Sequence, residues 1–344
     1  MTVLSPPDII RSAYVDLVVS DLEKSKWFWC EVLGMLVTAE EPGAVYLRGY
    51  EEITHHSLVL REGPIPAAAR LAYRVRTPED LQRAASYFAA LECPVRTVPA
   101  GTTRGIGEAV QVIDPLGFPL EFFHAVAHVE RMTQRFDLYR GAEIARLDHF
   151  NVVTPDIAAG NRFYTDLGFS LTETIEDEDV LYAVWLRRKQ TVHDVALTGG
   201  AGPRLHHLAF FTPEARNVLR TCDVLGSMGQ QAHIERGPGR HGVSNAFYVY
   251  LRDPDGHRVE IYTSDYYTGD PDHPTLRWSV HDDRRRDFWG NAVIQSWYRE
   301  ASPVLDLDGR PQPLVEPPAP AEADVVVGAD GFRAPVHLVA RELS

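Results

Sequence analysis

Cysteine is scarce in this sequence. Among 344 residues there are three cysteines, Cys30, Cys93 and Cys222, and they lie far apart. An odd number of widely separated cysteines argues against a disulfide framework and favours a reducing compartment. We therefore expect three free thiols that serve as small buried hydrophobic side chains.

Long hydrophobic runs are also absent. No apolar segment approaches the roughly 18 residues of a membrane span. The first residues, MTVLSPPDIIRS, lack the basic start and the apolar stretch of a signal peptide. The sequence thus predicts a soluble, cytoplasmic protein with no membrane partner.

Positive charge is in deficit. The chain has 34 Lys and Arg against 48 Asp and Glu, for a net charge of −14. This balance argues against a nucleic-acid partner, because such proteins bind phosphates through basic side chains. A few placed arginines can still bind an anionic small molecule. With 44% hydrophobic residues, the composition is globular, and the length allows about two domains.

Residues 1–265 contain an internal repeat. Residues 17–34 match 151–168, residues 71–91 match 206–226, and residues 114–123 match 253–262. The first two pairs each read as a strand followed by a helix, with helix starts at Asp21 and Asp156 in the first pair. The third pair reads as an Asp-Pro turn that leads into a strand.

The repeat predicts an α+β fold of two pseudo-symmetric domains. Each domain would contain two units of a strand, a helix and several strands. We expect the domains at residues 2–127 and 142–265, joined by a linker helix and turn at residues 128–141. Residues 266–344 differ in composition and are rich in proline, so we expect an extended C-terminal arm rather than a third core.

Three polar residues of the second half interrupt apolar strands at matched positions of the repeat: His149, His207 and Glu260. The repeat provides a control, since a residue needed only for folding tends to recur in both halves. At the corresponding places the first half has Val15 or a neighbour, Ala72 and Glu121. The glutamate recurs and the two histidines do not.

Two imidazoles and one carboxylate form the facial ligand set of non-haem Fe(II) oxygenases, which leaves open positions for a substrate and dioxygen. We therefore predict a metal site at His149, His207 and Glu260. His206 is not expected to be a ligand, because neighbours on a strand point to opposite faces. The alternative is that each histidine is an ordinary core or surface residue.

Five segments carry a family resemblance: RLDHFN, TVHDVALTGG, GPRLHHLAF, IERGPGRHGVSNAFYVYLRDPDGHRVEIYTSDYYTGDP and RRDFWGN. Together they resemble the extradiol ring-cleaving catechol dioxygenases of the vicinal oxygen chelate superfamily, above all those that act on 3,4-dihydroxyphenylacetate. The resemblance extends to about Asp308. It implies paired βαβββ modules, a metal in the C-terminal domain and a homotetramer. The C-terminus is shorter than is usual for the family, in which the tail helps to close the site.

The resemblance also implies a role for each site residue. The metal ligands would be His149, His207 and Glu260, and the catalytic residues would be His193, as the acid–base group, Tyr250 and His241. The substrate-binding residues would be Asn151, Trp185, Arg236 and Arg286, with the two arginines receiving a substrate carboxylate.

Several of these roles have a physical reason of their own. An imidazole such as His193 can accept and return a proton near neutral pH. A guanidinium can bind a carboxylate through two hydrogen bonds, and an indole can form a wall for an aromatic substrate. Each residue also has an ordinary reading: a solvent-exposed loop histidine, a surface arginine, or Trp185 and Tyr250 as packing residues. Arg286 lies in a run of three arginines, and such runs are usually solvated.

The predicted function is extradiol cleavage of a carboxylate-bearing catechol, with 3,4-dihydroxyphenylacetate as the preferred candidate. Dioxygen would be the co-substrate, Fe(II) or alternatively Mn(II) the cofactor, and a hydroxymuconic semialdehyde the product. Two alternatives stay open: a glyoxalase-like isomerase of the same superfamily, and a metal-free module that binds an aromatic compound.

Overall fold

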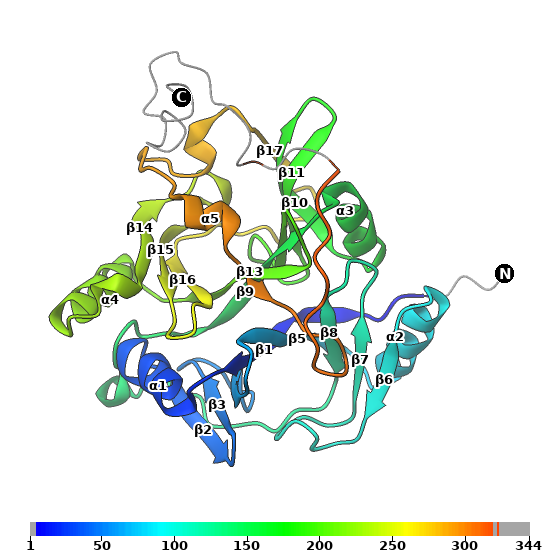
Figure 1. Cartoon of the computed structure of the whole chain (residues 1–344), viewed down its shortest axis with the longest axis horizontal. Helices are drawn as coiled ribbons and strands as arrows, with labels where there is room; N and C mark the ends of the chain where they lie inside the picture. Colours follow the sequence, from blue (N-terminus) through cyan, green and yellow to red (C-terminus); the bar gives the residue numbers. More distant parts are fainter. Residues whose placement is uncertain (1–4, 319–321, 323–344) are drawn as a thin grey trace.

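The computed structural model of the chain describes residues 5–318 and residue 322. It contains two large twisted β-sheets, one in each half of the chain, with helices packed on their outer sides (Figure 1). This arrangement confirms the predicted α+β class.

Eight strands form the first sheet, in the order β2-β3-β4-β1-β5-β8-β7-β6. They are β1 (Ile9–Val19), β2 (Leu36–Glu41), β3 (Ala44–Arg48), β4 (Leu58–Glu62), β5 (Ala67–Val75), β6 (Val95–Val98), β7 (Ala109–Ile113) and β8 (Pro119–Phe123). Helix α1 (Leu22–Trp27) follows β1, and helix α2 (Glu79–Ala90) follows β5. Each half of the sheet is therefore one strand–helix–three-strand module.

The second sheet repeats this order strand for strand, as β10-β11-β12-β9-β13-β16-β15-β14. Its strands are β9 (Arg146–Thr154), β10 (Ser170–Asp177), β11 (Val180–Arg187), β12 (Val195–Gly199), β13 (Arg204–Phe211), β14 (Ile234–Arg240), β15 (Phe247–Arg252) and β16 (Arg258–Thr263). Helix α3 (Ile157–Asp166) follows β9, and helix α4 (Ala215–Ser227) follows β13.

Local sequence explains where the first helix of each half begins and where the chain turns after it. Asp21 and Asp156 are the N-caps of α1 and α3, and their carboxylates accept hydrogen bonds from the amides of Lys24 and Ala159. After the first helical segment of each half, Gly34 and Gly168 have φ values of +82° and +87°, which a side chain with a Cβ rarely adopts.

The main hydrophobic core lies on the helix-covered faces and continues from one domain to the other. Tyr73 of β5 and Phe150 of β9 both belong to it, and their rings are 5.7 Å apart. Because side chains alternate along a strand, the neighbours of Phe150, His149 and Asn151, point to the opposite face of the second sheet. The three cysteines are free but only partly buried at the edge of this core.

The linker contradicts the predicted helix. Residues 128–141 contain a single short turn of 3-10 helix, Phe136–Leu138. The amide of Val129 donates to the carbonyl of Ile53, and that of Met132 donates to the carbonyl of Tyr50, both at 2.8 Å. These two amides thus bond to the first domain, and the hydrogen bonds within the linker form turns rather than an α-helix.

The C-terminal arm leaves the second sheet and crosses toward the first domain (orange in Figure 1). Its elements are β17 (Leu276–Ser279), which pairs with β10, α5 (Gln295–Arg299) and β18 (Ser302–Pro303), which pairs with β13. Beyond β18, the amide of Leu305 donates to the carbonyl of Ala68 in β5. The short C-terminus noted in the sequence, residues 325–344, lies outside the described residues. Among the described residues, no helix is long and apolar enough to cross a membrane.

Candidate metal centre

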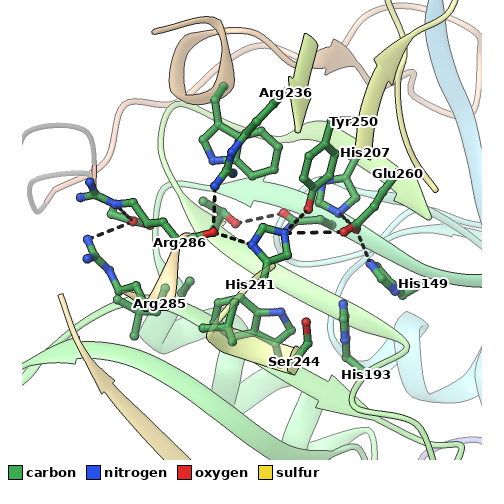
Figure 2. Close-up of a pocket in the computed structure, with 18 residues that line it drawn as sticks. His149, His193, His207, Arg236, His241, Ser244, Tyr250, Glu260, Arg285 and Arg286 are labelled. Atoms are coloured by element: carbon green, nitrogen blue, oxygen red, sulfur yellow. Dashed lines mark hydrogen bonds and ion pairs between the residues drawn. The ribbon is translucent and has the colours of Figure 1, made fainter. Parts of the chain in front are cut away.

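His149, His207 and Glu260 meet on the inner face of the second sheet. They lie on β9, β13 and β16, which are adjacent strands. One carboxylate oxygen, Oε2 of Glu260, lies 3.3 Å from Nε2 of His149 and 3.3 Å from Nε2 of His207 (Figure 2). The candidate ligand atoms all lie within 4.8 Å of one another, and all three side chains are buried.

This arrangement fits a divalent metal ion. Burial alone would raise the pKa of Glu260, but the imidazoles of His149, His207 and His241 around the carboxylate outweigh burial and hold that pKa well below its usual range. The carboxylate is therefore anionic. With two imidazole nitrogens it makes a three-atom ligand set on one side of an ion, as Fe(II) or Mn(II) accepts in facial sites.

Each candidate histidine ligand has a second partner through its other ring nitrogen. Nδ1 of His149 lies 2.9 Å from a carboxylate oxygen of Asp148, and Nδ1 of His207 lies 2.7 Å from Nδ1 of His206. Such outer partners set which nitrogen faces a metal. The expectation that His206 points to the opposite face is wrong, because a register irregularity between Leu205 and His207 breaks the strand alternation.

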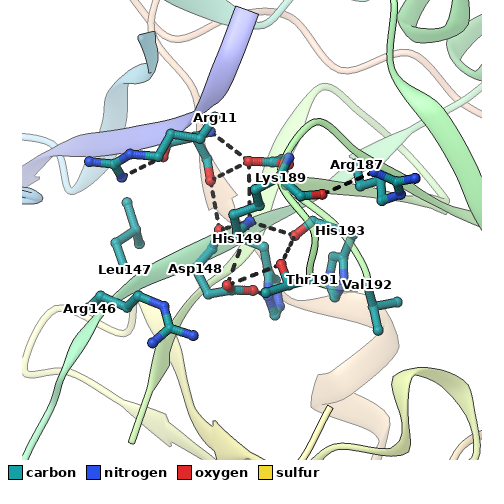
Figure 3. A network of polar contacts seen from close by, with 12 residues as sticks. Arg11, Arg146, Leu147, Asp148, His149, Arg187, Lys189, Thr191, Val192 and His193 are labelled. Carbon is teal, nitrogen blue, oxygen red and sulfur yellow. Dashed lines mark hydrogen bonds and ion pairs between the residues drawn. The ribbon is translucent and has the colours of Figure 1, made fainter. Parts of the chain in front are cut away.

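His193 lies beside the centre, and its ring centroid is 3.7 Å from that of His149. Figure 3 shows how its backbone is held: the ammonium of Lys189 donates to the carbonyl of His193 at 2.7 Å and to the carbonyl of Asp148 at 2.6 Å. Burial, reinforced by the charge of a protonated His149, lowers the pKa of His193 well below its usual value. The imidazole is therefore neutral, and its Nδ1 is buried without a protein partner in the described part of the chain.

His241 and Tyr250 form a second polar pair at the centre. Nε2 of His241 lies 2.9 Å from the hydroxyl of Tyr250 and 3.7 Å from Oε1 of Glu260. Tyr250 stands directly opposite Glu260 in the pairing of β15 with β16. Nδ1 of His241 lies 2.5 Å from the carbonyl of Arg286, which ties this pair to the arm.

Buried arginines occupy the other end of the pocket (Figure 2). Arg236 lies with its guanidinium carbon 4.4 Å from the ring of Trp297, and its Nε is buried without a partner. Arg286 donates from Nε to Glu322 at 2.7 Å, and Arg285 lies 3.1 Å from the same carboxylate. A second carboxylate, that of Asp283, lies 3.9 Å from Arg285 and 3.4 Å from Arg286. Glu322 and Asp283 therefore pair with these two arginines. Arg236 has no carboxylate partner among the described residues, so its guanidinium can receive an anion.

The remaining predicted residues line the same pocket. The side-chain oxygen of Asn151 accepts a hydrogen bond from Thr198 at 3.0 Å, and Trp185 is 8% exposed in an apolar cluster beside the site. All ten residues chosen from the sequence therefore line one pocket, and their individual roles stay predictions.

Sequence reasoning missed the other residues that line this pocket, among them Ser244, Arg285, Trp297 and Glu322. Arg285 belongs to the run of three arginines, and such runs are usually solvated. It lies 3.9 Å from Asp283, but it also faces the pocket. Trp297 and Glu322 gave no signal of their own, because the arm's path over the sheet determines which of its residues reach the pocket. Ser244 lies in the glycine-rich segment before β15, where no chemical pattern singled it out.

The strand register also corrects the comparison of the two halves. Glu260 is paired with Ala209, which faces His149 on β9; Glu121 is paired with Ala72, which faces Tyr14 on β1. Tyr14, a neighbour of Val15, therefore corresponds to His149.

Ala72 corresponds to Ala209, so the predicted equivalence of Ala72 with His207 is wrong. Two positions before each alanine, Arg70 faces Asp16 and His207 faces Asn151.

Arg70 is therefore the counterpart of His207. The alignment failed because the repeated Thr-Pro-Glu begins the two helices differently. Pro78 is the N-cap of α2, whereas Glu214 is the N-cap of α4.

Comparison with known proteins agrees with this geometry. Residues 11–122 and 146–261 each match the family described as the Glyoxalase/Bleomycin resistance protein/Dioxygenase superfamily. The two matches coincide with the two sheets.

Two curated relatives are dioxygenases. A metapyrocatechase of Geobacillus stearothermophilus is 30% identical over 86% of this chain and 94% of its own length. A manganese-dependent 2,3-dihydroxybiphenyl 1,2-dioxygenase of Geobacillus genomosp. 3 is 29% identical over 82% of this chain and 94% of its own length.

Solved structures show a closer likeness. A variant of homoprotocatechuate 2,3-dioxygenase from Brevibacterium fuscum is 55% identical, with a TM-score of 0.93 over 96% of this chain and 92% of its own. The homoprotocatechuate 2,3-dioxygenase of Arthrobacter globiformis is 58% identical, with a TM-score of 0.90 over 91% of this chain and 98% of its own. The chain therefore belongs to the glyoxalase/bleomycin resistance protein/dioxygenase superfamily and, within it, to the extradiol ring-cleaving dioxygenases, as its sequence motifs predicted.

Proposed function

We propose that this chain cleaves the ring of a catechol that carries a carboxylate side chain, beside the two hydroxyl groups, with dioxygen as co-substrate. The observation that carries this proposal is the layout of one buried pocket, with the His149–His207–Glu260 ligand set at one end and arginines at the other. Because two similar structures are named homoprotocatechuate 2,3-dioxygenases, we take 3,4-dihydroxyphenylacetate as the substrate. The product is a hydroxymuconic semialdehyde.

The ligand set would hold Fe(II) or Mn(II), and the metal would supply a common binding site for the two catechol oxygens and dioxygen, and a route for electrons between them. His193 takes a proton from a substrate hydroxyl and returns it later, since its imidazole is neutral and its Nδ1 is free. The hydroxyl of Tyr250 and the imidazole of His241 hydrogen-bond to each other and orient oxygen atoms near Glu260.

The carboxylate of the substrate is bound at the arginine end. Arg236 lies there with an unpaired Nε, and Arg286 lies beside it. Glu322 occupies part of this end through its ion pairs with Arg285 and Arg286. A bound substrate carboxylate shares these arginines with Glu322 or displaces it. Trp185 forms an apolar wall for the ring.

Oxygen uptake tests the proposal. Purified protein loaded with Fe(II), and in parallel with Mn(II), is given 3,4-dihydroxyphenylacetate, and the metal content is measured on the same sample. We expect one dioxygen consumed per substrate and a yellow ring-opened product. Bound metal without uptake on 3,4-dihydroxyphenylacetate, 3,4-dihydroxybenzoate or plain catechol would contradict extradiol cleavage, and the isomerase alternative would then be tested. Catechol binding that survives His149→Ala without metal would favour the binding module.

Substrate charge can be tested separately. Arg236→Met removes a guanidinium and keeps an apolar stem, so kcat/KM for 3,4-dihydroxyphenylacetate should fall by about 10- to 100-fold, as for loss of one charged hydrogen-bonding partner of about 1.5–3 kcal/mol. The value of kcat/KM for plain catechol, which has no carboxylate, should change little. An equal loss on both substrates would contradict carboxylate recognition by Arg236.

Two wider predictions from the sequence belong to the same proposal. We infer a homotetramer and a cytoplasmic location. Sedimentation of the purified protein and fractionation of its host cells are the measurements that check them.

A further inference from the structure

His206 has no role in the proposed function, yet it links the metal centre to the C-terminal arm. Its side chain is 3% exposed. Nδ1 of His206 lies 2.7 Å from Nδ1 of His207, and Nε2 of His206 lies 2.8 Å from the carbonyl oxygen of Trp297 in α5. The three residues therefore form one chain of hydrogen bonds.

The carbonyl of Trp297, at the end of this series of hydrogen bonds, determines which ring nitrogens of His206 and His207 carry a proton. A carbonyl oxygen only accepts, so Nε2 of His206 must carry the proton and donate it to Trp297. In a neutral imidazole the other nitrogen, Nδ1, is then an acceptor, and it can only accept from Nδ1–H of His207. The remaining nitrogen of His207, Nε2, is left with a lone pair, and it is the atom that faces Glu260 at 3.3 Å.

The other histidine ligand is held differently. Nδ1 of His149 meets the carboxylate of Asp148, its neighbour on the same strand, at 2.9 Å. That partner needs nothing from outside the second sheet. His207 instead depends, through His206, on the backbone carbonyl of Trp297, which lies 91 positions after His206 in the chain.

Helix α5 is fixed where this contact requires it. Arg258, whose side chain is fully buried, donates to the carbonyls of Ser296 and Glu300, both at 3.0 Å, and to the carbonyl of His206 at 3.1 Å. The ring of Trp297 meanwhile lines the pocket, with its centroid 4.3 Å from that of Tyr250. The same residue of the arm thus contacts the pocket with its ring and His206 with its carbonyl.

We propose that His206 is a positioning residue: it transmits the seating of helix α5 to His207 and holds His207 in the tautomer that can bind the metal. This inference rests on the metal site of the proposed function. It deepens that proposal by making the arm part of the metal centre. Outer partners of this kind contribute on the order of 10- to 100-fold to metal affinity.

The test measures Mn(II) binding to the full chain without any catechol, by the loss of the free-ion EPR signal on titration. His206→Phe keeps a ring but removes both nitrogens, and we expect Mn(II) affinity to fall by about 10- to 100-fold. His206→Gln can accept through its carbonyl and donate through its amide, as the imidazole does, so it should recover most of that loss.

His257 provides a matched control. It is also a buried histidine with two ring contacts, to the hydroxyl of Ser302 at 2.7 Å and the carbonyl of Val18 at 2.9 Å, and it lies away from the pocket. His257→Phe should lower the unfolding temperature of the metal-free protein about as much as His206→Phe does, with Mn(II) affinity unchanged.

Three outcomes overturn the inference: wild-type affinity in His206→Phe, an equal loss of affinity in His257→Phe, or no recovery in His206→Gln. A wild-type chain that binds Mn(II) with this pattern but takes up no oxygen would overturn the proposed function and leave the role of His206 supported.

Discussion

The inner faces of the two sheets have the same strand order and a glutamate at the same position, but they satisfy it in different ways. In the second domain, Glu260 meets the imidazoles of His149 and His207. In the first domain, Glu121 accepts a hydrogen bond from Tyr14, and its second oxygen lies 3.5 Å from Nε of Arg70. A buried carboxylate needs a positive partner. In the first domain the guanidinium of Arg70 is this partner. In the second domain a metal ion held by His149, His207 and Glu260 would be the partner.

The likeness extends beyond the ligand positions. His56 stands two residues before the start of β4, just as His193 stands two residues before β12, and both strands pair with the central strand in the same register. Gln111 faces Glu121 as Tyr250 faces Glu260. The two sheets therefore carry polar side chains at the same positions. They differ in the few side chains that could bind a metal ion. A buried histidine beside such a frame is not by itself a sign of catalysis.

The largest expected contrast concerns the two glutamates. Glu260→Gln should lower activity by about 10³-fold or more, because it removes the anionic ligand of a metal worth several kcal/mol. Glu121→Gln should leave kcat and metal content near wild type and lower the free energy of unfolding by about 1–3 kcal/mol, since it disturbs a buried hydrogen-bonded network. Activity, metal analysis and denaturant unfolding of both variants check this. Comparable losses of activity would remove the distinction between the domains.

His193 and His56, which each lie two residues before a strand that pairs with the central strand, give the next contrast. His193→Asn should lower kcat by about 10²- to 10⁴-fold, the usual contribution of a general acid–base group, while Mn(II) still binds. His56→Asn should leave kcat within about threefold, because its neighbours Tyr14 and Tyr46 pack on it in a closed cluster. Steady-state kinetics with metal analysis decides the matter. A large fall in kcat for His56→Asn would show that the first domain contributes to catalysis.

The comparison can also be sharpened by converting one face into the other. The double variant Tyr14→His, Arg70→His would place a His-His-Glu set on the first sheet. We expect it to bind a second Mn(II) ion with an affinity lower by about 10- to 100-fold, because the residue before Tyr14 is Ala13, where the second domain has Asp148. Equilibrium dialysis against Mn(II) measures the stoichiometry. A folded double variant that binds one ion would show that strand position alone does not define the site.

The smallest expected effect concerns the buried aspartates of the two Asp-Pro turns. Burial raises the pKa of Asp114 to about 7 and also raises that of Asp253. A carboxyl whose folded pKa lies above its unfolded value of about 3.9 stabilises the fold most when protonated, and this stabilisation is lost as pH rises from about 4 through 7. Asp114→Asn does not titrate and keeps an acceptor for the amides of Leu116 and Phe118.

The loss of stability between pH 4 and 8 should therefore be shallower in Asp114→Asn than in the wild type. Thermal unfolding of both proteins across this range tests the prediction. Parallel curves would mean that Asp114 is ionised throughout.

Much of the fold and of the site could be read from the chain. The repeat, the aspartate caps at Asp21 and Asp156 and the residues of the ligand set are local or pairwise patterns, and all ten chosen residues line one pocket. The failures concern features that no short window contains. The irregularity at Leu205–His207 turns His206 toward His207, and the arm brings Trp297 and Glu322 into the pocket.

The sequence by itself determined the class of the fold, the family and the kinds of side chain available for a metal, because periodicity, capping residues and motifs are properties of neighbouring residues. The tertiary structure decided which side chains meet. Strand register made Arg70, rather than Ala72, the first-domain counterpart of His207. The folded arm supplied the carbonyl of Trp297 that orients His206 and, through it, His207. Contacts of this kind depend on the relative position of distant segments, which sheet pairing sets to within one residue and which no local pattern encodes.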